Sequence, residues 1–185
     1  MLYRHSWACL PSAAEYRRHW PQLLHDTRSI IGHVRAAGVV IAGTNGLRRP
    51  VVNAHGIAFN GDATSDLDGQ PFTLLAPIDA PGVLTVTASC TTGRKPYDAA
   101  VAAVLLRCAL LMPGAFAVAS TGRWDQQWAR GAMLERLDEP GYQLAARTVI
   151  AELFGDHPAA NPLYGSLADI QFPLTVPGPS RNGSR

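Results

Sequence analysis

The chain has 185 residues, of which 47% are hydrophobic and 16% charged, values that suit one domain with one sizeable core. The net charge of +2 is too small to argue for a nucleic-acid or membrane surface from bulk charge alone. Three widely spaced cysteines without a CxxC pair, no apolar leader and no run approaching the roughly 20 residues of a membrane span predict a cytoplasmic protein with no membrane partner.

The first predicted element is an amphipathic helix. Apolar residues recur at helical spacing over residues 16–34, and Gly38 supplies a stop. Ser12 as N-cap and Glu15 three positions later form a predicted capping box. Pro21 lies inside the pattern, so we expect either a kink or a break followed by a second helix.

Short extended segments separated by turn residues follow the helix. Asn60-Gly61-Asp62 and Pro81-Gly82 are turn signals, and residues 64–70 form an acidic polar loop. Because the connections are short, the segments predict a compact antiparallel meander. The predicted strands cover residues 39–42, 50–52, 56–59, 72–78 and 83–89.

The second half of the chain is predicted to be mainly helical. Pro96 and Asp98 favour a helix start, and residues 99–106 are apolar, which places this helix in the core. Trp124 and Trp128 share a helix face that packs either internally or against a partner. A strand is predicted at residues 116–119, and further helices at residues 124–137 and 141–154 with a stop at Gly155.

This order of elements predicts an α+β fold, with an antiparallel or mixed sheet and helices packed on one face. We assign residues 1–155 to this single domain and residues 156–185 to an irregular extension rich in Pro and Gly. The last residues, 180–185, are expected to be disordered.

A strand, a glycine turn and a helix start with two cations predict an anion-binding site. Gly93 permits close backbone approach, while Arg94 and Lys95 can hold a phosphate or carboxylate. Thr121-Gly122-Arg123 repeats the pattern after the next strand, and parallel strands would bring both turns to one sheet edge. The predicted ligand-binding residues are therefore Gly93, Arg94, Lys95 and Arg123; alternatively, Gly93 only makes the turn and the cations are solvated or paired.

Two weaker candidates carry other chemistry. Asp62, Asp66 and Asp68 could hold Mg²⁺ or Ca²⁺, although their spacing does not match a calcium loop and such segments are usually solvated turns. Apart from this divalent metal, no cofactor is expected. Cys90 lies near cations and a helix start that would favour a thiolate, but a buried and inert thiol is the commoner case. The six histidines show no paired metal spacing.

The motifs Phe59-Asn60-Gly61 and Arg94-Lys95-Pro96-Tyr97-Asp98 support a resemblance over about the first two-thirds of the chain. The chain resembles a group of small uncharacterised bacterial and phage-associated proteins in which an F-N-G turn precedes an R-K-P-Y-D helix start. The resemblance implies no activity. It implies that residues 94–98 are a recurring structural element.

Three functional hypotheses follow. The first is a binding protein for an anionic ligand bearing phosphate, such as a nucleotide or nucleic acid, at the strand-to-helix turns. The second is a non-catalytic assembly or adaptor subunit that docks on another protein, or on a second copy, through its Trp-bearing helix and C-terminal extension. The third is a metal-dependent phosphoryl-transfer enzyme; it ranks last because no recognised catalytic spacing is present.

Overall fold

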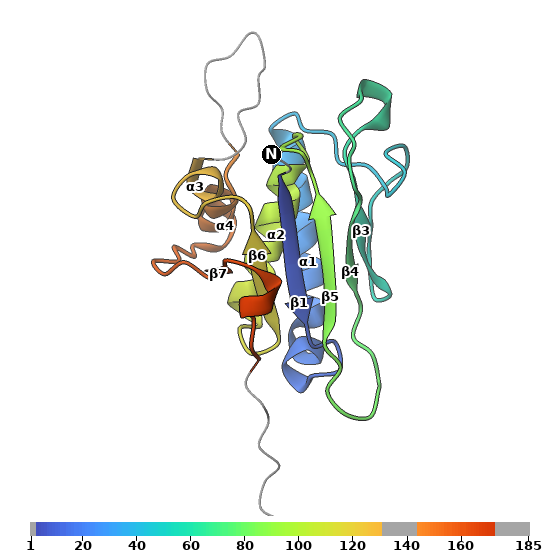
Figure 1. The fold of residues 1–185 in the computed structure, drawn as a ribbon. Helices are drawn as coiled ribbons and strands as arrows, with labels where there is room; N and C mark the ends of the chain where they lie inside the picture. The colour runs from blue at the N-terminus through green and yellow to red at the C-terminus, as the bar shows by residue number, and fades with distance from the viewer. Residues whose placement is uncertain (1–2, 131–143, 173–185) are drawn as a thin grey trace, which may run out of the picture.

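The main sheet is built around the N-terminal strand. The computed structural model describes residues 3–130 and 144–172 (Figure 1). In the strand order β5-β1-β6-β7, β1 is antiparallel to both of its neighbours, whereas β6 and β7 are parallel. Consequently β5 and β6 run in the same direction and end at the same edge. The strands are β1 (Arg4–Cys9), β5 (Val86–Thr91), β6 (Phe116–Ser120) and β7 (Leu163–Tyr164).

Sequence reasoning missed β1. His5, Trp7 and Cys9 are buried at alternate positions, the period that a strand imposes on side chains. Ala8 between them is also buried. A strand buried on both faces carries a weaker alternating signal in its sequence, so this segment was not predicted as a strand.

A second sheet is an antiparallel meander of three short strands. Its order is β2-β3-β4, so the predicted meander is confirmed here, whereas β5 leaves it and pairs with β1. The strand predicted at residues 39–42 is wrong, because Ala42 makes only a single bridge to Asn60. The backbone of this segment is hydrogen-bonded to the end of the first helix instead. Val39 N–H donates to the Val34 carbonyl, and the Arg35 side chain donates to the Ile41 carbonyl. The strands are β2 (Val51–Asn53), β3 (Gly56–Phe59) and β4 (Phe72–Leu75).

Helix α1 (Ala14–Ala36) is continuous through Pro21, so the predicted break is wrong. Pro21 lies on the exposed face, where water can hydrogen-bond the carbonyl that the proline leaves free. The capping box is also wrong, because the N-cap residue is Ala13, without a side-chain bond. The Ser12 hydroxyl instead accepts from Leu84 N–H at 3.1 Å. The predicted apolar face is buried as expected.

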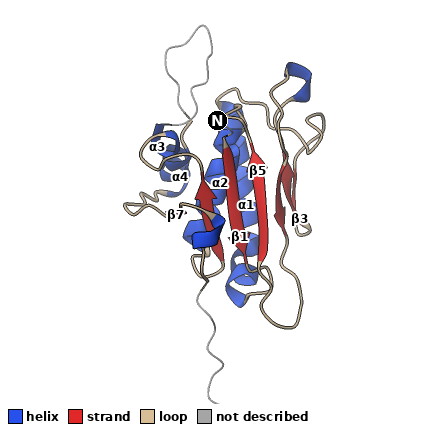
Figure 2. Cartoon of the chain, in the orientation of Figure 1, coloured by secondary structure: helices blue, strands red, loops and turns tan. Residues whose placement is uncertain are grey.

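Three helices lie against one face of the main sheet. Helix α2 (Asp98–Leu111) is buried along residues 99–106, as predicted, and packs against α1, β6 and α4 (Ala146–Phe154). Figure 2 shows α1 and α2 behind the strands. Helix α4 ends at Gly155, whose φ of 69° is left-handed. The arrangement confirms a single α+β domain.

The C-terminal part contributes to this domain more than predicted. A short helix, α3 (Gln127–Arg130), follows β6 and begins three residues later than predicted, because residues 124–126 form a turn. The second predicted helix begins at Ala146 rather than at residue 144 or before within the described part, and residues 131–137 and 141–143 of the two predicted helices lie outside the described residues. Strand β7 joins the main sheet beside β6, and the 3-10 turn at Leu167–Asp169 contacts β1. The domain therefore continues past residue 155; residues 180–185 lie outside the description.

Candidate functional site

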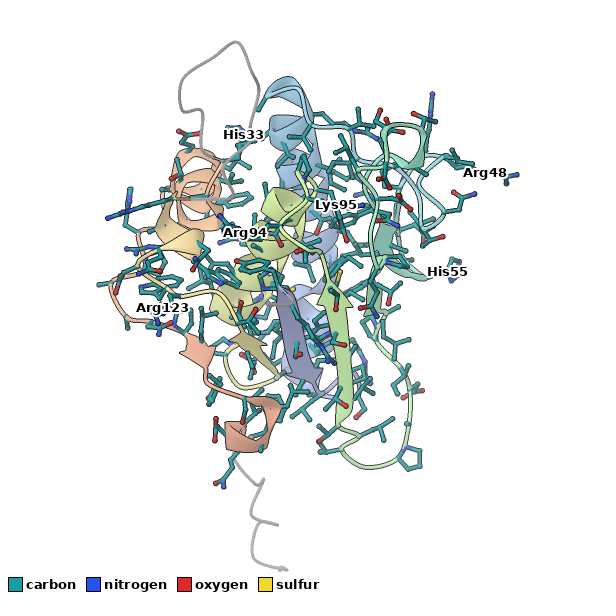
Figure 3. The ribbon with its side chains drawn as sticks, turned by 45° about the horizontal axis from the view of Figure 1, so that its top comes forward. His33, Arg48, His55, Arg94, Lys95 and Arg123 are labelled. Carbon is teal, nitrogen blue, oxygen red and sulfur yellow. The ribbon has the colours of Figure 1, made fainter. Side chains whose placement is uncertain are left out.

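The two Gly-Arg turns lie at the same edge of the main sheet, called here the carboxyl edge, where β5 and β6 end and β1 begins. Arg4 pairs with Thr91 at the end of β5, and its carbonyl accepts from Thr121 N–H just after β6. Arg94 follows β5 and Arg123 follows β6 at this edge (Figure 3). The two strands are parallel, as the site hypothesis required.

The positive charges of the two arginines in these turns have no acidic partner in the described part of the chain. Arg94 is exposed, has a left-handed φ of 63°, and its guanidinium carbon lies 6.0 Å from the centroid of the Tyr3 ring. Arg123 is exposed, and its backbone N–H donates to Gln127. Within residues 3–130 and 144–172, neither guanidinium makes an ion pair or a hydrogen bond. Both are therefore available to an anion.

Lys95 has a different role from its neighbour. Its ammonium donates to the carbonyl oxygens of Asp66, at 2.9 Å, and Asp68, and lies 3.7 Å from an Asp66 carboxylate oxygen. Lys95 therefore holds the acidic loop against the head of α2. Gly93, exposed and left-handed with a φ of 61°, donates its N–H to the Tyr3 carbonyl at 3.2 Å.

The first amides of α2 are hydrogen-bonded within the chain. Asp98 N–H donates to Lys95, Ala99 N–H to Pro96 and Ala100 N–H to Tyr97, at 2.9, 3.3 and 3.0 Å. The Asp98 carboxylate occupies the first turn, where the helix dipole favours negative charge. An anion at the carboxyl edge would therefore meet arginine side chains rather than these amides.

A buried chain of polar side chains links three elements beneath the edge. His5 on β1 is completely buried. Its Nε2 lies 2.8 Å from Oδ1 of Asp98 on α2, and its Nδ1 lies 3.0 Å from the hydroxyl of Ser120 on β6. Thr92, which follows β5, donates its hydroxyl to the same Asp98 oxygen at 2.5 Å. We call Ser120, His5, Asp98 and Thr92 the buried relay.

The hydrogen-bond partners fix the tautomer of His5. The Ser120 oxygen accepts from Gly122 N–H at 2.9 Å and from Trp128 Nε1–H at 3.2 Å, which uses both of its lone pairs. Its own proton must then be donated to Nδ1 of His5. Nδ1 is thus an acceptor, and Nε2 carries the proton that is donated to Asp98.

Aromatic rings enclose the histidine. Tyr3 and Trp128 each meet the His5 ring edge-on, with centroids 5.1 and 5.3 Å away. Burial, and secondarily the Asp98 charge, raises the pKa of Tyr3 above its usual range. Trp124 and Trp128 are 7% and 1% exposed, so their shared face packs internally and is not a free docking surface.

The acidic loop is organised by its own hydrogen bonds. Asp62 caps the 3-10 turn at Ala63–Ser65, accepting from Thr64 N–H at 3.0 Å; bonds from the Thr64 and Ser65 hydroxyls lower the pKa of Asp62. The Asp66 carboxylate is fully exposed. In the described residues, Asp62, Asp66 and Asp68 form no cluster that could hold a metal, and no other group of three His, Cys, Asp or Glu does.

The two motifs behind the family resemblance pack against each other. A Cβ at Gly61 would lie 2.0 Å from the Leu67 carbonyl oxygen and 2.9 Å from the Tyr97 ring, so only glycine fits. The Tyr97 hydroxyl donates to the Gln70 carbonyl at 2.9 Å, and the Asn60 side-chain amide donates to Gly69 at 3.0 Å. The F-N-G turn and the R-K-P-Y-D segment thus form one structural unit beside the carboxyl edge.

Cys90 does not have the properties of a nucleophile. The thiol is completely buried and donates to the Gln70 carbonyl at 3.0 Å. Burial raises the pKa of Cys90 to about 12, so the reactive thiolate is scarce at neutral pH. The inert-thiol interpretation is the one that the environment supports.

Sequence reasoning missed His5 and Ser120, the members of the relay on β1 and β6. The alternate spacing of His5, Trp7 and Cys9 in the sequence could have placed His5 on the same strand face as Trp7. Their meeting with Asp98 depends on strand order, which one sequence does not fix.

Comparison with known proteins adds no relative, since no family model, curated protein or solved structure matches the chain. Among the described residues, no helix combines the length and apolarity that crossing a membrane requires.

Proposed function

We propose that the protein binds a small anionic ligand, bearing phosphate or carboxylate, at the carboxyl edge. The observation that carries the proposal is the pair of exposed arginines, Arg94 and Arg123, that follow parallel strands and have no acidic partner in the described part of the chain. A guanidinium offers two parallel N–H bonds to such an anion. Two of them at one edge would each bind an anionic group of a ligand that lies along that edge.

The other residues predicted to bind ligand have supporting roles in this proposal. Gly93 closes the turn that carries Arg94 against Tyr3, and Lys95 fixes the acidic loop at the flank of the site. The three cysteines are free and buried, which is compatible with the reducing cytoplasm as the place of action.

Thermal stability in the presence of anions tests the proposal. Phosphate, AMP and ATP are added to the wild type and to the variant Arg94→Gln/Arg123→Gln, which keeps polar side chains but removes both charges. A ligand at 100 times its Kd stabilises by about 2.7 kcal/mol, and the melting temperature should rise accordingly in the wild type alone. The control is Arg48→Gln, which removes one exposed charge on the meander side of the molecule (Figure 3).

The proposal is wrong if no anion raises the melting temperature of the wild type, or if the double variant keeps the rise. An equal loss in Arg48→Gln would also contradict it, because the effect would then reflect overall charge rather than the carboxyl edge.

A further inference from the structure

We propose that the buried relay activates Ser120 as a nucleophile for acyl transfer, in particular for hydrolysis of an ester. Ser120, His5 and Asp98 are joined in that order by hydrogen bonds of 3.0 and 2.8 Å. The pattern of a hydroxyl bonded to an imidazole that is in turn oriented by a carboxylate is the arrangement that nucleophilic catalysis uses.

The relay is in the protonation state that the reaction needs. Nδ1 of His5 carries no proton and accepts from the Ser120 hydroxyl, so it can act as a general base. The opposite nitrogen donates to Asp98, which fixes the ring and stabilises the positive charge that develops when Nδ1 takes up a proton. The Thr92 hydroxyl holds the carboxylate in place at 2.5 Å.

Ser120 lies at the outer end of the relay. Ser120 is the last residue of β6 and is partly exposed, whereas His5 behind it is completely buried between Tyr3 and Trp128. Ser120 is therefore the member of the relay through which it reaches the carboxyl edge. Gly122 N–H and Trp128 Nε1–H donate to the hydroxyl oxygen at 2.9 and 3.2 Å, so one of these two bonds must open to free the lone pair that attacks a carbonyl carbon.

The reaction is balanced with water and the ester alone. The Ser120 oxygen attacks the ester carbonyl carbon while its proton passes to Nδ1 of His5. The bond from that carbon to the alkoxy oxygen breaks, and His5 gives the proton to the departing alcohol. Water then attacks the acyl group on Ser120, with His5 taking its proton and returning it to the serine oxygen as the acid leaves.

The substrate class follows from the position of the relay. Arg123 comes three positions after Ser120 in the same turn, and Arg94 lies across the edge on the neighbouring turn. An ester that also bears a phosphate or carboxylate group would place that group among the arginines. This anionic part of the inference rests on the proposed function, whereas activation of Ser120 does not.

Covalent labelling with an alkyl fluorophosphonate probe tests the relay without knowledge of the substrate. The probe reacts with an activated serine, whose oxygen displaces fluoride from phosphorus. Native full-length protein should incorporate one probe at Ser120, as located by peptide mass spectrometry. Labelling should vanish in Ser120→Ala and persist in Ser89→Ala, a serine on β5 that contacts Arg4 but no histidine.

Two further measurements separate activation from structure. Asp98→Asn keeps an acceptor for His5 but loses the charge, and should slow labelling by about 10²- to 10⁴-fold while circular dichroism and tryptophan fluorescence stay native. The labelling rate of native wild-type protein should exceed that of urea-unfolded protein, which has the same serines without the relay. Should Asp98→Asn fail to fold, this comparison and the site of labelling still decide.

The inference is overturned if native protein is not labelled faster than urea-unfolded protein, if the probe is found elsewhere, or if Ser120→Ala labels normally. Labelling should be retained in Arg48→Gln, which removes an exposed charge away from the carboxyl edge. Labelling of the wild type together with loss of anion binding in Arg94→Gln/Arg123→Gln supports both proposals; labelling without any anion binding in the wild type removes only the proposed function.

Discussion

Replacement of Gly61 by Ala tests the unit formed by the two motifs. The added methyl group would lie 2.0 Å from the Leu67 carbonyl oxygen, where an ordinary contact begins at 3.4 Å, so the backbone must move by more than an ångström. Overpacking of this kind costs about 1–3 kcal/mol. Movement of residue 67 also endangers the bond from Leu67 N–H to the Asp62 carbonyl, at 2.8 Å, which contributes about 1 kcal/mol.

The expected loss is therefore about 2–4 kcal/mol in the free energy of unfolding. Urea unfolding, followed by tryptophan fluorescence and far-ultraviolet circular dichroism, measures it. The matched control is Gly32→Ala, on the exposed face of α1 with no atom within 4 Å of the new methyl group; it should stabilise by about 0.5–1 kcal/mol. If Gly61→Ala unfolds at the same urea concentration as the wild type while Gly32→Ala shows its gain, the packing argument is refuted.

Two other predictions concern buried groups. Burial raises the pKa of Cys9 to about 11 and of Cys90 to about 12 from an ordinary value of 9.0, so the native state keeps protons that the unfolded chain releases. Stability should accordingly be complete below pH 9 and fall as pH rises toward 12, and a urea midpoint unchanged between about pH 8 and 10.5 would contradict this. Asp26 is buried and accepts from Arg107 at 2.6 Å, so Asp26→Ala should cost about 3 kcal/mol in urea unfolding. The exposed Asp125→Ala should cost less than about 0.5 kcal/mol, and an equal effect of the two would show that burial is not the cause.

Local sequence patterns predicted the helices better than the strands. The apolar spacing of α1 and the apolar run of α2 each identify a helix without reference to the rest of the chain. The segment over residues 39–42 has strand composition, but Arg35 and the end of α1 bind its backbone instead. Strand propensity describes which conformation a segment can adopt, whereas the elements packed beside it determine whether its backbone pairs with another strand.

The sequence predicted the part of the candidate site that follows from consecutive elements along the chain. It missed the contacts that join residues far apart in the sequence. Two strand-turn-helix passages with the same Gly-Arg signature placed Arg94 and Arg123 at one edge. The Lys95 side chain points toward the acidic loop because it binds Asp66 and Asp68, which precede it by 29 and 27 positions in the chain. The partners of His5 lie 93 and 115 positions away, so no local pattern could reveal the relay.

The central position of β1 has a consequence for how the protein folds. The first strand of the chain pairs with residues that follow much later, Arg4 with Thr91 and His5 with Ser120. β1 cannot pair until β5, and then β6, has been synthesised, so the main sheet cannot form while only α1 and the meander are complete. High contact order of this kind slows folding, because the entropy cost of closing a long loop comes before the stabilisation from strand pairing. During translation, α1 and the meander should therefore collapse before β1 enters the main sheet, and β1 should pair with β5 before β6 is available.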